Sequence, residues 1–190
     1  MKRKERQEEV AKSNDYQGFY DELERETDRG AALLAGALID NFLAALLEAF
    51  FIETPPTKKG APTEVEKLLY EPNAPLGTFS SRATTAYCLG LISYEDFKDI
   101  YLIKDIRNHF AHRLQGYSFS TPSILQKCKR LSITQHLKPS IPIPAFDEPR
   151  SLFEMAVAAH AVRLEIKRLE VAAKQKRKSP DAKIIQVVQV

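Results

Sequence analysis

The sequence lacks the motifs that identify the commonest nucleotide-dependent and hydrolytic enzymes. Its 190 residues contain no GxGxxG or GxxxxGK[ST] phosphate loop, no HExxH metal motif and no GxSxG nucleophile motif. Tryptophan is absent. Cysteine occurs only at Cys88 and Cys128, without a CxxC pair and without histidines at metal-ligand spacing. These absences predict two free thiols in a reducing cytoplasm, no metal site and no bound cofactor.

A segment typical of export or of membrane insertion is also missing. The first six residues are mostly charged and no apolar stretch follows them, so they do not form a secretory signal. The longest apolar run, Gly30 to Ile52, is interrupted by Asp40, Asn41 and Glu48. Charged side chains are costly in lipid, so this run predicts a buried helix. We expect a cytoplasmic protein that does not contact a membrane.

Charge of neither sign dominates the chain. There are 28 Lys and Arg against 25 Asp and Glu, a net charge of +3, and 44% of the residues are hydrophobic. This balance is ordinary for a soluble globular protein, and so mild a basic excess does not by itself indicate nucleic-acid binding. The sequence also contains no convincing helix-turn-helix with a basic recognition helix.

Helical periodicity, helix-capping residues and helix-breaking prolines predict an all-α fold. The chain length suits a single multi-helix bundle of about six or seven helices. The long apolar helix and the helix that ends at His112 carry the widest apolar faces, so we expect them at the centre. The predicted helices span residues 28–51, 63–70, 79–91, 93–112, 122–131 and 151–174.

Composition divides the chain further. A charged segment, 1–18, precedes a helical core, 19–131. A proline-rich connection, 132–150, whose residues 137–144 cannot be helical, leads to a C-terminal helix, 151–175. The last part, 176–190, is a basic and β-prone tail.

Reactive side chains are densest at residues 107–112, Arg-Asn-His-Phe-Ala-His. An arginine such as Arg107 can bind a phosphate bidentately, and a histidine such as His112 can transfer a proton near neutral pH. Together with Asn108, these residues resemble the Arg-x4-His motif of HEPN domains, many of which are RNA-cutting toxins or nucleotide-binding helical modules. The resemblance implies a HEPN-like bundle in which Arg107, Asn108 and His112 form a metal-independent catalytic site.

Helix geometry leaves a structural alternative open for this motif. Arg107 lies about 140° round an ideal helix from His112, so a single helix does not aim both at one point. A catalytic site would therefore need a second copy of the helix across a two-fold axis. In the structural alternative, Arg107 holds two helices together and His112 interacts with the helix dipole. Asp40, inside the most apolar helix, is either the partner of a structural arginine or the residue that fixes Arg107 for phosphate binding.

A second candidate site lies at the start of the helix that follows Gly77. Ser80 and Arg82 lie in its first turn, where backbone N–H groups, a hydroxyl and a guanidinium can hold an anion. We therefore consider Ser80 and Arg82 as phosphate-binding residues. The alternative is an ordinary helix N-terminus with an exposed arginine.

Four segments in a fixed order carry a more extensive resemblance. They are residues 27–34, 74–82, 86–92 and 103–112, and with their spacing they resemble the mannitol operon repressor (MtlR) family over roughly Thr27 to Leu131. The resemblance implies an all-helical bacterial regulator that works as an oligomer and lacks a standard DNA-reading module. The proline-rich connection and the tail lie outside the shared region, so mannitol itself is not carried over.

Two functions follow from these patterns. The first is a dimeric regulator that represses transcription through contacts with a protein or with RNA or DNA. The alternative is a HEPN-type metal-independent endoribonuclease, toxin-like or defensive, that uses Arg107 and His112. In an enzyme both residues must reach one open groove, and this geometry distinguishes the two functions.

Overall fold

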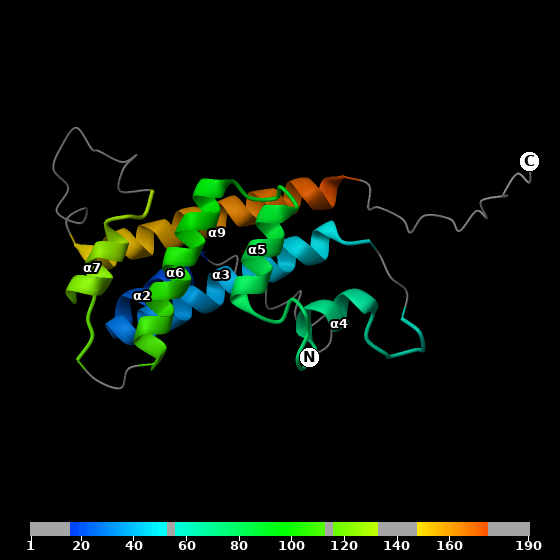
Figure 1. The fold of residues 1–190 in the computed structure, drawn as a ribbon, viewed down its shortest axis with the longest axis horizontal. Coiled ribbons are helices and arrows are strands. Elements are labelled where there is room, and N and C mark those ends of the chain that lie inside the picture. The colour runs from blue at the N-terminus through cyan, green and yellow to red at the C-terminus, as the bar shows by residue number, and fades with distance from the viewer. Residues whose placement is uncertain (1–15, 53–55, 113–115, 133–147, 175–190) are drawn as a thin grey trace, which may run out of the picture.

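The computed structural model describes residues 16–52, 56–112, 116–132 and 148–174, and in these ranges it contains seven helices and no strand (Figure 1). The prediction of an all-α bundle of six or seven helices is confirmed. Residues 133–147 of the proline-rich connection, most of the charged N-terminal segment and the basic tail lie outside the described residues. The helices are α2 (Tyr16–Arg25), α3 (Asp28–Phe50), α4 (Glu64–Tyr70), α5 (Phe79–Cys88), α6 (Tyr94–His112), α7 (Pro122–Cys128) and α9 (Pro149–Ala173).

Local capping sets most of the helix ends. The side chain of Thr27 accepts a hydrogen bond from the Gly30 N–H at the start of α3. Thr63 and Thr78 begin α4 and α5 with reciprocal capping boxes, which satisfy backbone donors that a helix start leaves free. The helix α5 ends at Cys88, earlier than predicted, because Gly90 adopts a left-handed φ of 68° and turns the chain.

The apolar helix α3 lies at the centre of the bundle. It packs most extensively against α9 and also contacts α6, α5, α2 and α4. By length and hydropathy α3 could cross a membrane, but 61% of its most apolar window is buried inside the bundle. The other helices therefore provide the apolar environment that this sequence requires.

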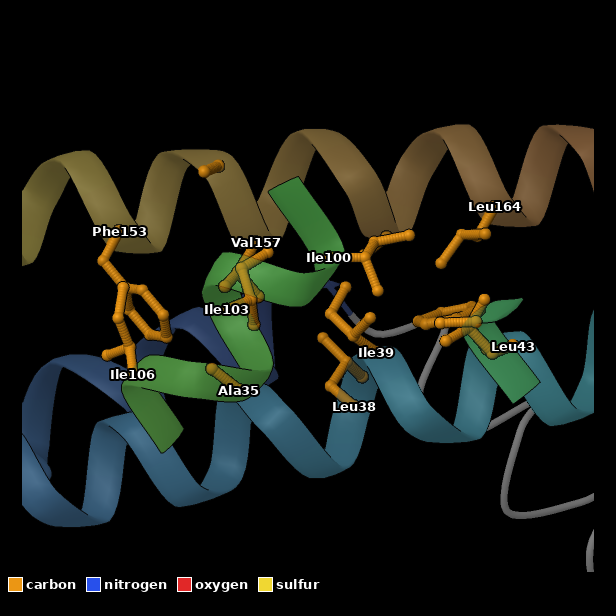
Figure 2. Packing of buried hydrophobic residues seen from close by; sticks show 14 of the residues in the cluster. Ala35, Leu38, Ile39, Leu43, Ile100, Ile103, Ile106, Phe153, Val157 and Leu164 are labelled. Carbon is orange, nitrogen blue, oxygen red and sulfur yellow. The ribbon is translucent and has the colours of Figure 1, made fainter. Parts of the chain in front are cut away.

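Side chains of α6 fill the space between α3 and α9. Ile100, Ile103 and Ile106 are fully buried, and Figure 2 shows Ile103 and Ile106 beside Val157 and Phe153 of α9. Near the end of α6, the ring of Phe119, which precedes α7, packs between two other rings. Its centroid lies 5.1 Å from that of Phe110 on α6 and 5.1 Å from that of Phe153 on α9. The predicted contact between the long helix and the helix that ends at His112 is confirmed.

Replacing Leu43 tests this core. Leu43 lies on α3 and is fully buried, so Leu43→Ala should lower the free energy of unfolding by about 2–5 kcal/mol through lost burial and a residual cavity. The matched substitution Leu89→Ala, at a residue 39% exposed, should cost less than about 1 kcal/mol. Urea unfolding measures both. Equal losses at the two positions would contradict the central placement of α3.

Candidate functional site

Arg107 lies against the middle of α3 through a close backbone approach. A Cβ atom on Gly36 would lie 2.6 Å from Cγ of Arg107, so the arginine stem rests directly on the glycine. The Nη1 atom of Arg107 donates to Oδ1 of Asn108 at 3.0 Å, and the arginine is half-buried. The absence of a side chain at Gly36 thus lets Arg107 lie flat between α3 and α6.

His112 lies apart from Arg107 at the exposed end of α6. The carbonyl of Ala111 in the same helix turn accepts a long hydrogen bond, 3.4 Å, from Nη2 of Arg29 on α3. Arg107 instead faces Gly36, more than a turn before the helix end. One chain therefore does not bring the two predicted catalytic side chains together, and their catalytic role stays a prediction that needs a second copy.

Asp40 forms its ion pair with Arg82, an arginine that joins helices, and the role expected for Asp40 in fixing Arg107 stays a prediction. Nη1 of Arg82 donates to Oδ2 of Asp40 at 2.7 Å. Arg82 begins from the first turn of α5 and reaches α3 across the bundle, whereas the head of Arg107 is held by Asn108. Sequence patterns identified Asp40 as the partner of an arginine but not the arginine that would reach it.

The environment of Arg82 also bears on the predicted anion site. Its Nε donates to the Leu76 carbonyl at 2.9 Å and its Nη2 to the Leu69 carbonyl at 2.8 Å, and the residue is only 8% exposed. Each guanidinium nitrogen thus has an acceptor within the protein. Ser80 is half-buried in the same helix turn. Anion binding by Ser80 and Arg82 stays a prediction, and the guanidinium joins α3, α5 and the end of α4.

The carboxyl group of Asp40 is largely removed from water, so its charge depends on the groups around it. Burial raises the pKa of its carboxyl above the usual value, although Arg82 and, through space, Arg107 oppose the rise. Its Oδ1 atom is buried and has no hydrogen-bond partner among the described residues. Removing the Arg82 guanidinium would leave a carboxylate with little solvation and two carbonyls without their donor.

A double-mutant cycle tests the assignment of this pair. Arg82→Met should destabilise the fold by more than about 3 kcal/mol, because it strands Asp40. Combined with Asp40→Asn, it should lose less than the sum of the single changes, with a coupling energy of about 1–3 kcal/mol. The control cycle pairs Asp40→Asn with Arg107→Met and should show a smaller coupling. Larger coupling to Arg107 than to Arg82, measured by urea unfolding, would reverse the assignment.

A buried histidine between two carboxylates joins α6 and α9, and sequence patterns did not identify it. His160 is 2% exposed. Its Nε2 lies 3.0 Å from Oδ2 of Asp99, and its Nδ1 lies 3.4 Å from Oδ1 of Asp96. Arg163 also donates to Asp96, at 2.9 Å, and Asp99 accepts hydrogen bonds from the N–H and hydroxyl of Ser132.

These contacts favour the charged forms of all three groups. The hydrogen bond with His160 is the largest influence on Asp96 and holds its pKa well below the usual range. Burial alone would raise the pKa of Asp99, but hydrogen bonds from His160 and Ser132 outweigh it and the pKa is lowered. Burial opposes charge on His160 as well, yet the two carboxylates raise its pKa. Both ring nitrogens of His160 lie beside carboxylate oxygens, and this arrangement favours the imidazolium form.

The order of groups in this cluster does not suit nucleophilic catalysis. Ser132 donates to Asp99 at 2.6 Å, and the carboxylate rather than the serine contacts His160. A catalytic serine needs its base beside the hydroxyl. The cluster instead ties the segment after α7 to α6 and α9. A sequence signal did exist, because Asp99 interrupts the apolar stripe of α6 and His160 that of α9.

The free energy of unfolding should depend on pH through the charges of His160, Asp96 and Asp99. Because the pKa of His160 is raised in the folded state, its charge stabilises the fold below about pH 6.5. That contribution is lost as the pH rises through the folded-state pKa. The lowered pKa values of Asp96 and Asp99 have the opposite sign: their contribution is present above about pH 3.9 and is lost as the pH falls.

His160→Ala should therefore destabilise the fold by about 3–5 kcal/mol at mildly acidic pH, because it strands buried carboxylates. In this variant the free energy of unfolding should fall less steeply between pH 6.5 and the pKa that His160 has in the folded wild type. Urea unfolding over a pH series measures both effects. The exposed His112 provides the control, and His112→Ala should cost less than about 0.5 kcal/mol. An unchanged pH slope in His160→Ala would exclude a charged His160.

Cysteine and metal chemistry add little to the site. Both cysteines are free, and burial raises the pKa of the Cys128 thiol to about 12, so this thiol stays protonated. Among the described residues no group of three or more His, Cys, Asp and Glu side chains is arranged to hold a metal ion.

Fold and site together define a class: an all-α helical module whose buried ionic groups join helices to one another. The chain belongs to the mannitol repressor (MtlR) family, whose model matches residues 19–175, and this confirms the resemblance seen in the sequence. No curated protein matches the chain. The X-ray structure of the MtlR–HPr complex from Escherichia coli is similar, with 23% identity and a TM-score of 0.50 over 82% of this chain and 99% of that one. At this identity the likeness shows the fold alone.

Proposed function

We propose that this chain is a cytoplasmic, dimeric regulator that acts by binding a protein partner. The observation that supports it is that the buried charged side chains contact partners inside the bundle. Arg82 is held by Asp40 and two carbonyls, and His160 by two carboxylates. These groups join helices inside the bundle, and we therefore place the functional surface on the outer face of the helices. Membership of the mannitol repressor family supports a regulatory role.

The partner we propose is HPr from the same cell. The similar Escherichia coli structure is a complex of MtlR with HPr. The similarity extends over 99% of that chain, and this supports HPr as the partner to test first. The sequence contains no convincing helix-turn-helix with a basic recognition helix that would favour DNA as the first partner. Contacts with RNA or DNA stay the alternative mode of regulation.

Binding to purified HPr tests the proposal. Titration calorimetry with HPr should show saturable binding, whereas an unrelated protein of matched size and charge should not bind. Arg107→Ala and His112→Ala should leave the affinity for HPr within about twofold, because a binding module does not need a catalytic pair. No detectable heat or complex with HPr, up to high concentration, would contradict this choice of partner.

The ribonuclease alternative predicts a different result. The protein would cut RNA in EDTA at about pH 6–8, where a histidine can transfer a proton. His112→Ala would then lose about 10²–10⁴-fold of the rate. Under the regulator proposal, wild type and His112→Ala leave RNA equally intact. Cleavage that depends on Arg107 and His112 would therefore replace the regulator with the enzyme.

A further inference from the structure

An apolar stripe stays exposed on the outer side of α9. Val162, Ile166 and Leu169 are 44%, 53% and 53% exposed. Among the described residues the other exposed large hydrophobic side chains are Tyr87, Leu89 and Tyr94, at the α5–α6 turn. The opposite side of α9 is buried against α3 and α6. A second apolar stripe on this helix is therefore not explained by the core of its own chain.

The spacing of this stripe is that of a coiled coil. It repeats in steps of four and three along the helix, and its first members are half-buried and its last exposed. Alternating steps of four and three give a 3.5-residue period, which keeps one narrow seam facing a second helix. The seam consists of Met155, Ala159, Val162, Ile166, Leu169 and Ala173.

We propose that the seam pairs antiparallel with the same seam of a second copy of this chain, around a two-fold axis beside Lys167 and Arg168. In this register Ile166 lies opposite Leu169 of the second copy. Because the axis relates the two chains, the same contact occurs twice. In this register the seams overlap over residues 162–173, about 17 Å at the helical rise per residue, and Val162, Ile166, Leu169 and Ala173 of each copy form the paired stripe.

Charge complementarity selects this partner and this direction. On one edge of the seam the antiparallel register places Arg163 opposite Glu170 of the second copy, and it does so twice. Both side chains are more than half exposed, and within one chain Arg163 pairs with Asp96 and Glu170 with Lys167. On the other edge Glu165 is neutralised by a bidentate pair with Arg168 in its own chain. A parallel pairing would instead bring Glu165, already paired with Arg168, beside Glu170 of the second copy and would lack the two Arg163–Glu170 contacts.

The position of the seam also separates it from the Arg107 region. The contacts of Asp96 and Asp99 place the first turns of α6 beside α9. His112 lies thirteen residues beyond Asp99, about 20 Å along the helix. Dimerisation through α9 therefore leaves Arg107 and His112 of the two copies apart, and it builds no composite catalytic site at this axis.

This inference rests on the dimeric part of the proposed function, and its test measures self-association without HPr, so the two can fail separately. Sedimentation velocity on the full chain should show a dimer. Ile166→Lys should be monomeric at concentrations where wild type is dimeric. Leu89→Lys, the same kind of change at an exposed leucine outside the seam, should stay dimeric. Thermal melts show that both variants fold.

A charge swap tests the antiparallel register. Arg163→Glu and Glu170→Arg each place like charges opposite one another twice, and each should weaken the homodimer by about 2- to 30-fold. An equimolar mixture of the two variants should dimerise more tightly than either alone, since every facing pair is then opposite in charge. Loss of the Arg163 contact with Asp96 cannot explain such a recovery.

Three results would overturn the inference. The first is a wild type that stays monomeric across the whole concentration range, which would leave the seam to the chain's own tail or to another protein. The second is an Ile166→Lys variant that stays dimeric. The third is a mixture of the two charge variants that dimerises no more tightly than either variant alone. Dissociation by Leu89→Lys alone would move the interface to the α5–α6 turn.

Discussion

The need to cover α3 determines the arrangement of this protein. The helix α3 is 23 residues long, its apolar side chains cover most of its circumference, and eleven of its residues are buried. A helix of this kind is stable in water only when other helices surround it. The helices α9, α6 and α5 supply most of that cover. The approach is closest where Gly36 offers no side chain, and there Arg107 lies along the helix surface.

Covering α3 so completely creates a second requirement, because polar groups at the helix contacts lose water. The structure meets it with ionic contacts between distant segments: Arg82 with Asp40, His160 with Asp96 and Asp99, and Arg150 with Asp28. Desolvation offsets much of the attraction in such pairs, so they add little net stability. Their geometry is demanding, and a misplaced helix would leave a buried charge alone. We infer that they select the arrangement of the helices.

Helix positions could be predicted from the sequence because their signals are local. Thr63 with Glu66, and Pro122 at a first turn, are read within a few residues. The ionic pairs could not be predicted, because 42 residues separate Arg82 from Asp40 and 61 separate His160 from Asp99. Two arginines were available to Asp40, and only the path of the chain between helices decides which one reaches it.

Residues 107–112 were identified from the sequence as a possible catalytic motif, but their orientation depends on how the helices pack. Residues 107–112 combine reactive side chains over two helical turns, but the bundle orients Arg107 toward Gly36 and leaves His112 at the exposed helix end. The seam on α9 has the opposite character: its residues are chemically plain, and only their spacing and exposure together mark them as unusual. A pattern along one helix becomes informative once the side that its own core uses is known. In α9 that side is occupied by α3 and α6, and the apolar side that remains is the face that we propose to pair with a second copy.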